Sequence, residues 1–226
     1  VDEPFDLILY GSICALGFAF VENTLYLMRS DLFAIGGRAL FASVAHMFFT
    51  SIIAYSLAMA RHHGRSMVLY GAFGLILASV AHGFYDYWLL SPDRPHLLTM
   101  LFFLGNIHLW VAMKNNLVNL SPHYQVDMRP QPTMFRYRII NALLAIFGST
   151  YVMKFLLDGP GPPDALLEAQ GSTMGAMLLF LAVSFSSFRF VPGHIAPLRP
   201  KGSLWRLLFP VVHWGEDLSG QRILLR

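Results

Sequence analysis

The 226-residue chain is 55% hydrophobic and 13% charged, whereas ordinary soluble domains carry about 25% charged residues. Apolar runs of about twenty residues recur along its whole length, and each is long enough to span a hydrocarbon core about 30 Å thick. This composition excludes a soluble globular domain and predicts an all-α fold, a polytopic transmembrane helix bundle. The formal net charge of +3 does not indicate nucleic-acid binding, because the basic residues lie in short loops and in the tail rather than on one helix face.

Six membrane helices are predicted in chain order. The first follows a polar Asp-Glu-Pro lead-in, in which Pro4 suits the first turn of a helix. A short loop, Arg29–Arg38, should precede the second helix because it contains the pair Gly36-Gly37. Proline-rich segments bound the third and later helices. The predicted helices cover about 5–28, 39–60, 67–90, 96–118, 137–157 and 171–190, and together form a bundle domain over residues 1–190.

Loop charges predict the orientation of this bundle. Six helices would place the N-terminus, the loops 61–66 and 114–138, and the tail 191–226 on one side. That side holds twelve of the sixteen Lys and Arg residues, eleven in these segments and Arg189 at the end of the sixth predicted helix. Because positively charged loops remain on the cytoplasmic side, we expect these segments to be cytoplasmic. The basic tail, rich in proline and aromatic residues, should lie at the surface of the lipid bilayer.

Glu22 is the only formal charge inside the first apolar run, 7–28. An ionised side chain in hydrocarbon costs several kcal/mol, so such a residue usually has a partner or a function. Its position close to the end of the predicted first helix places it in the outer half of the bilayer.

The second and third apolar runs supply candidate partners for this carboxylate. His46 and Thr50 share one face of the second predicted helix, and His82 and Asp86 share one face of the third, because residues four apart are neighbours on a helix. In the predicted orientation both histidines and Asp86 lie at the level of Glu22, roughly 9 Å from the outer helix ends at 1.5 Å per residue. The sequence therefore predicts that these three helices meet around Glu22.

Three interpretations of this group remain open. A buried carboxylate with two imidazoles can take a proton from water, stabilise an oxyanion or protonate a leaving amine. Alternatively, Glu22, His46 and His82 form a polar network that holds three helices in register; ionisable groups within membranes favour the functional interpretation. The third interpretation is zinc binding by Glu22, His46 and His82. The His-x-x-x-His spacing is lacking, so no metal or other cofactor is expected.

The order of these motifs is similar to that of a known family. Phe18-x-x-x-Glu22 is followed by Asn23, then by His46-x-x-x-Thr50 and His82-x-x-x-Asp86, all after the Asp-Glu-Pro lead-in. This pattern, over residues 2–90, resembles the PrsW family of intramembrane proteases. The helices after residue 90 resemble the family only in general character.

The resemblance implies a relative of the CAAX-type prenyl-protein endopeptidases and of the gamma-secretase scaffold subunit. Proteolytic members of that superfamily use glutamate and histidine to activate water. The resemblance also implies a protein of the bacterial cytoplasmic membrane that cleaves single-span membrane proteins, such as anti-sigma factors, near the extracytoplasmic side. The depth deduced above for Glu22 agrees with that side.

One family motif does not occur in this sequence. It is a Glu-Glu-x-x-Lys helix upstream of the lead-in, whose glutamates are regarded as the catalytic core. Because the sequence starts at Val1 and not at Met, we expect further upstream sequence with at least one more helix. Loss of the motif would instead favour a non-catalytic membrane scaffold or accessory subunit that binds partner helices.

The resulting hypothesis is a PrsW-like intramembrane peptidase. Glu22 is a water-activating or supporting carboxylate, and His46 and His82 stabilise the oxyanion or carry protons. Asp86 and Asn23 would orient these groups. The hypothesis adds Phe18 and Thr50 as supporting residues. A transporter is disfavoured, because the polar groups cluster at one end of the helices rather than lining a path through the membrane.

Overall fold

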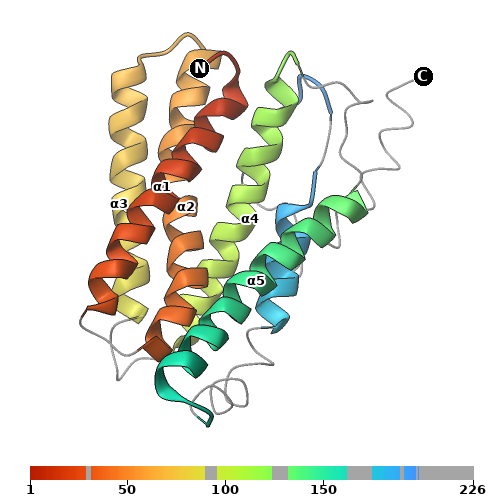
Figure 1. The fold of residues 1–226 in the computed structure, drawn as a ribbon. Coiled ribbons are helices and arrows are strands. Elements are labelled where there is room, and N and C mark those ends of the chain that lie inside the picture. The colour runs from red at the N-terminus through yellow and green to blue at the C-terminus, as the bar shows by residue number, and fades with distance from the viewer. Residues whose placement is uncertain are drawn as a thin grey trace. The chain divides into compact units, whose positions relative to one another are not determined.

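A computed structural model of the chain describes residues 1–28, 32–89, 96–123, 132–161, 175–188, 191–196 and 198. The regular structure within these ranges is entirely helical, which confirms the all-α prediction. A shorter apolar helix, Gly175–Phe185, follows five long ones. The long helices are α1 (Pro4–Leu27), α2 (Leu32–His62), α3 (Met67–Leu89), α4 (His96–Leu120) and α5 (Pro132–Asp158) (Figure 1).

All five long helices are long and apolar enough to cross a membrane. Their outward-facing side chains are largely Leu, Ile, Val and Phe, most plainly along α1 and α3. Such surfaces are stable next to lipid and not next to water. The chain is therefore an integral membrane protein.

Two helices begin earlier than the sequence predicts. α2 starts at Leu32, so Gly36 and Gly37 lie inside a helix and not in a loop. Glycine lowers helix stability by only about 1 kcal/mol per residue, and the apolar run on both sides outweighs that cost. α5 starts at Pro132, where proline fits the first helical position because it lacks only an N–H that would have no partner within the helix.

The C-terminal part of the chain differs from the prediction in two places. Lys114, assigned to a loop, lies inside α4 and is buried. The last helix ends at Phe185, before the predicted end at 190, and residues 171–174 of the predicted range fall outside the described residues. Residues 199–226, which form most of the predicted surface tail, also fall outside them.

The structure divides into two compact units. The first contains Val1–Ala15, Ala45–Arg129 and Ser187–Arg226, and the second contains Leu16–Val44 and Pro130–Ser186. The dividing points fall within α1 and α2, so each of these helices contributes to both units.

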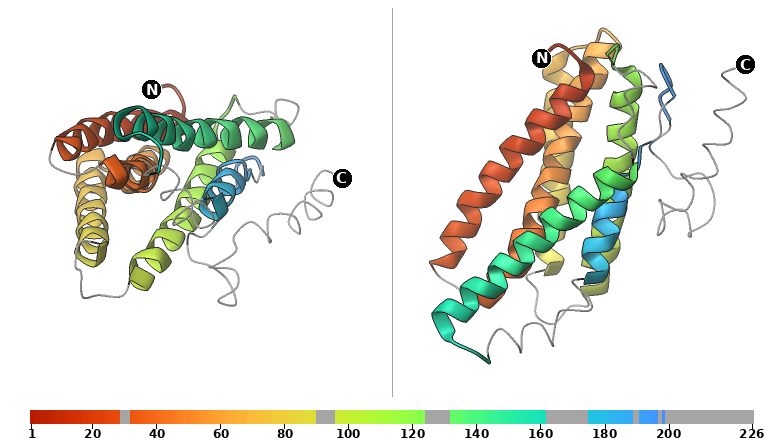
Figure 2. Two further views of the ribbon diagram at one scale, coloured as in Figure 1. Left: turned by 60° about the horizontal axis from the view of Figure 1, so that its bottom comes forward. Right: turned by 45° about the vertical axis from the view of Figure 1, so that its right-hand side comes forward.

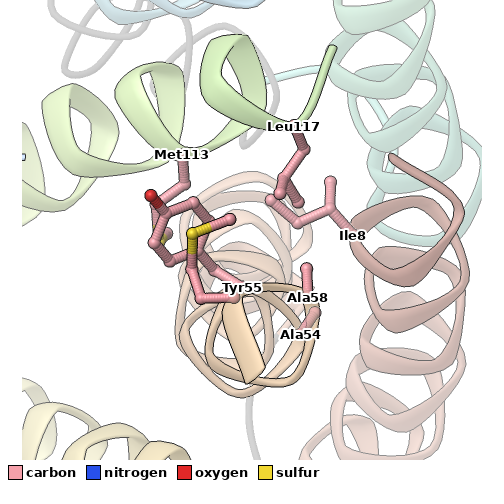
Figure 3. Packing of buried hydrophobic residues seen from close by; sticks show 7 residues of the cluster. Ile8, Ala54, Tyr55, Ala58, Met113 and Leu117 are labelled. Atoms are coloured by element: carbon pink, nitrogen blue, oxygen red, sulfur yellow. The ribbon is translucent and has the colours of Figure 1, made fainter. Parts of the chain in front are cut away.

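The first unit has an apolar core between α1, α2 and α4. Figure 3 shows Ile8 of α1 and Leu117 of α4 pointing toward small side chains of α2. Those small side chains let the helices approach closely, as small residues do in membrane proteins. The buried cluster consists of Ile8, Ala54, Tyr55, Ala58, Met59, Met113 and Leu117.

Two glycines lie at close helix contacts of this unit. A Cβ added at Gly11 of α1 would lie 3.3 Å from the Cβ of Ala54 on α2. One added at Gly74 of α3 would lie 3.0 Å from the Cα of Ile53, also on α2. The first contact brings α1 close to α2, and the second holds α3 along α2 (Figure 1).

Asparagines of α4 bind the main chain that follows the last helix. Asn116 donates from Nδ2 to the carbonyl of Ala196 at 2.9 Å, and its Oδ1 accepts from the N–H of the same residue at 2.9 Å. Asn119 likewise accepts from the N–H of Val191 and donates to the carbonyl of His194. These amides satisfy main-chain groups that have no helix or sheet partner. Residues 191–196 therefore run beside the end of α4 (Figure 2).

Candidate active site

His46 of α2 and His82 of α3 lie against each other in the first unit. Their ring centroids are 4.9 Å apart, and the ring planes are nearly perpendicular at 83°. His46 is buried, whereas the side chain of His82 is about one-third exposed. The close α2–α3 packing at Gly74 sets the helix separation that allows this contact.

Two further side chains hold the imidazole of His82. Its Nε2 is 3.1 Å from Oδ2 of Asp86, one helical turn along α3. The ring of Phe49 on α2 stacks on the imidazole of His82, with a centroid distance of 5.3 Å and an interplanar angle of 24°. A carboxylate bound to one ring nitrogen fixes which nitrogen carries the proton and orients the imidazole ring. The geometry therefore gives a carboxylate–histidine pair with a second histidine beside it.

Aromatic rings pack beside Phe49. Its ring centroid lies 5.9 and 6.5 Å from those of Tyr85 and Phe102, and Tyr85 contacts Phe103. On the side of Phe49 the imidazole of His82 therefore borders an apolar region, while 34% of the His82 side chain and 45% of the Asp86 side chain are exposed.

Glu22 and Asn23 belong to a polar cluster of the second unit. Nη2 of Arg38 on α2 is 2.8 Å from Oε2 of Glu22, and Nε of the same guanidinium donates to Oδ1 of Asn23 at 3.3 Å. Asn23 in turn donates from Nδ2 to Oγ of Ser43 at 3.4 Å. The guanidinium carbon lies 3.5 Å from the ring centroid of Tyr26.

The structure thus arranges the expected residues in two groups. His46, His82 and Asp86 come together in the first unit, and Glu22 pairs with Arg38 in the second. The meeting of all three helices around Glu22, at one depth in the bilayer, stays a prediction.

The two supporting residues have different surroundings. The methyl group of Thr50 lies 3.6 Å from the position that a Cβ on Gly11 would take, so Thr50 contributes to the α1–α2 contact. Phe18 is 57% exposed on α1. A role for either residue in the site remains an expectation.

Arg38 and Phe49 make contacts that the sequence motifs do not predict. Arg38 lies in the range predicted as a loop, and Phe49 is not among the candidate site residues. A single basic residue beside an apolar run, opposite in sign to the lone Glu22, could have indicated the ion pair. Phe49 lies three residues after His46, and this spacing places both side chains on one face of α2.

A metal centre was tested against the donors present. A catalytic zinc ion takes three protein ligands and keeps one open position. In the part of the chain that the structure describes, no three His, Cys, Asp or Glu side chains are arranged to hold an ion. His46 and His82 lie together in the first unit, whereas Glu22 belongs to the second. Zinc binding by Glu22, His46 and His82 stays a prediction.

Comparison with known proteins identifies the family. The profile of the PrsW family intramembrane metalloproteases matches residues 1–113. The chain belongs to the PrsW family. The matched range runs from the lead-in into α4 and includes Glu22, His46, His82 and Asp86.

Curated relatives agree with this membership. The chain is 33% identical over 111 residues to Protease PrsW of Geobacillus kaustophilus, a match that covers 49% of this chain and 48% of that protein. It is 34% identical over 122 residues to Protease PrsW of Bacillus subtilis, covering 53% and 56%. The PrsW-family chain therefore spans about half the length of the curated relatives it matches. No solved structure shows a significant match.

Proposed function

We propose that this PrsW-family protein is an intramembrane peptidase that cleaves single-span membrane proteins. The observation that carries the proposal is the His82–Asp86 pair at 3.1 Å, with His46 of a second helix against the same imidazole. An imidazole held by a carboxylate on a membrane-spanning helix is suited to proton transfer. The names of the curated relatives support a proteolytic role.

In the proposed reaction, a water molecule attacks the carbonyl carbon of the scissile peptide bond. A carboxylate takes the proton of this water, with Glu22 as the water-activating or the supporting group. His46 or His82 donates a hydrogen bond to the oxyanion that develops on the carbonyl oxygen. When the C–N bond breaks, an imidazole gives its proton to the leaving amine. Asp86 keeps His82 oriented for this step, and the products are a carboxylic acid and an amine.

The proposed setting is the bacterial cytoplasmic membrane, with residue 1, the loops 61–66 and 114–138 and the tail on the cytoplasmic side. Cleavage would then take place near the extracytoplasmic side, at the depth expected for Glu22, His46 and His82. The bias of the loop charges supports this orientation.

The test compares His82→Ala and Asp86→Asn with the full-length wild-type protein in proteoliposomes. The probe is a membrane-anchored anti-sigma factor with a tag at each end. His82→Ala should reduce the cleavage rate by roughly 10²- to 10⁴-fold, the usual contribution of a positioned acid–base group. Asp86→Asn should give a smaller loss, because the imidazole stays but is less well oriented.

A matched control is His62→Ala, since His62 is exposed at the end of α2. Melting temperatures in detergent separate a lost function from a lost fold. Unchanged cleavage by His82→Ala would refute the proposed role of this residue. An equal loss of folded protein would indicate that His82 is a structural contact between α2 and α3.

A non-catalytic scaffold is the second candidate. The close helix approaches at Gly11 and Gly74 show that this chain packs helices through small residues, and partner helices can bind in the same way. Intact mass and N-terminal sequencing of the protein from its native membrane separate the two functions. An upstream helix with a glutamate pair favours the peptidase, and its absence favours the scaffold.

A further inference from the structure

We infer that Arg38 is a positioning residue that fixes the orientation of the Glu22 carboxylate. The expected effect on catalysis rests on the proposed peptidase function. The positioning of Glu22 rests on the contacts of Arg38 in the second unit. Arg38 lies on α2 and reaches two consecutive residues of α1, Glu22 and Asn23. No role for a basic residue at this position follows from the motifs of the sequence.

The guanidinium of Arg38 binds two residues at once. Nη2 of Arg38 donates to Glu22 at 2.8 Å while Nε of the same planar group donates to Asn23 at 3.3 Å. Because both donors belong to one rigid plane, the two contacts set the position of the guanidinium and the rotation of the Glu22 side chain together. A lysine ammonium would supply the charge without this fixed geometry.

Neighbouring side chains fix the plane of the guanidinium. Tyr26, one turn after Glu22 on α1, lies under it with 3.5 Å between the guanidinium carbon and the ring centroid. Asn23 is itself held by Ser43, further along α2. The end of α1 is therefore bound to the start of α2 through two connected polar contacts, one at Arg38 and one at Ser43.

Burial makes this ion pair more than a surface contact. The side chains of Arg38 and Glu22 are only 18% and 27% exposed, and they lie on helices that otherwise carry apolar residues. Solvent screens such a pair less than an exposed one, and removing one partner leaves the other charge in an unfavourable environment. The carboxylate of Glu22 is thus held in one orientation and is not a freely rotating side chain.

The first measurement is the steady-state kinetics of Arg38→Gln, Arg38→Lys and the wild type on the tagged anti-sigma factor in proteoliposomes. Arg38→Gln should lower kcat by about 100-fold, the effect of misplacing a catalytic group by about 1 Å, and leave KM within about twofold. Arg38→Lys should recover part of the loss, because it restores the charge without the fork. Arg65→Gln, in the exposed loop between α2 and α3, is the matched control and should behave as the wild type. Equal kcat values for Arg38→Gln and Arg65→Gln would overturn the inference.

The second measurement does not depend on peptidase activity. Melting temperatures of Glu22→Gln, Arg38→Gln and the double variant form a double-mutant cycle. If Arg38 holds Glu22, the double variant should melt close to the less stable single variant, and additive losses would overturn the inference. If the wild type cleaves no anti-sigma factor, the proposed function fails, and the cycle still decides whether Arg38 positions Glu22.

Discussion

Asn116→Leu should detach the segment after the last helix from α4. Asn116 is 1% exposed and makes three hydrogen bonds: to Oη of Tyr55 at 3.0 Å, and to the carbonyl and N–H of Ala196 at 2.9 Å each. Each such bond contributes about 0.5–1.5 kcal/mol net, with averages near 0.6 kcal/mol for side-chain contacts within membranes. Leucine has the same branching and is larger than asparagine, so no cavity adds to the loss. The free energy of unfolding should therefore fall by about 2–4 kcal/mol.

Equilibrium unfolding in mixed detergent measures this loss, and limited proteolysis measures the accessibility of residues 191–196. The segment should become cleavable in Asn116→Leu while the helices stay protected. Thr99→Val is the control, because Oγ1 of Thr99 is also buried on α4 but has no hydrogen-bond partner among the described residues. The control should change stability by less than about 0.5 kcal/mol. An Asn116→Leu variant as stable as the control, with its segment protected, would refute the assignment of these bonds.

Two further substitutions test the helix contact and the site. Gly74→Ala should destabilise by about 1–3 kcal/mol, because the new Cβ would lie 3.0 Å from main-chain Cα of Ile53. On the same helix, the Cβ of Gly83→Ala would meet nothing within 4 Å, so this variant should be more stable by up to about 1 kcal/mol through helix propensity. Equal changes in the free energy of unfolding in detergent for Gly74→Ala and Gly83→Ala would contradict the contact between Gly74 and Ile53. Phe49→Leu should cost about 1–2 kcal/mol, because a smaller apolar side chain replaces a buried ring. It should nevertheless slow cleavage in the reporter assay, because it removes the ring that stacks on His82; an unchanged rate would show that this stacking does not orient the imidazole.

Most helix positions could be predicted from the sequence, because the length and the hydropathy of an apolar run are local properties. α1 and α3 match their predicted ranges to within one residue at each end. The start of α2 was missed because Gly36-Gly37 is a loop signal in water-soluble proteins. A membrane-spanning helix tolerates glycine, since its backbone groups have no water to bond with and must bond to one another.

Only some contacts of the candidate site could be predicted from the sequence, for a different reason. The four-residue spacing of His82 and Asp86 is a local signal, and the structure has these side chains in contact. The contact of His82 with His46 and Phe49 depends on the separation of α2 and α3, which Gly74 helps to set. No pattern within one helix encodes that distance.

The sequence by itself determined that the chain is a helical membrane protein, and its motifs pointed to the PrsW family. Apolar run length and the spacing of residues along one helix suffice for these conclusions, because the bilayer permits few other structures. Only the tertiary structure decided that Arg38 is the ion-pair partner of Glu22 and that amides of α4 bind residues 191–196. Such pairings join residues distant in the chain, and they form only where helix packing brings a donor within hydrogen-bonding distance of an acceptor.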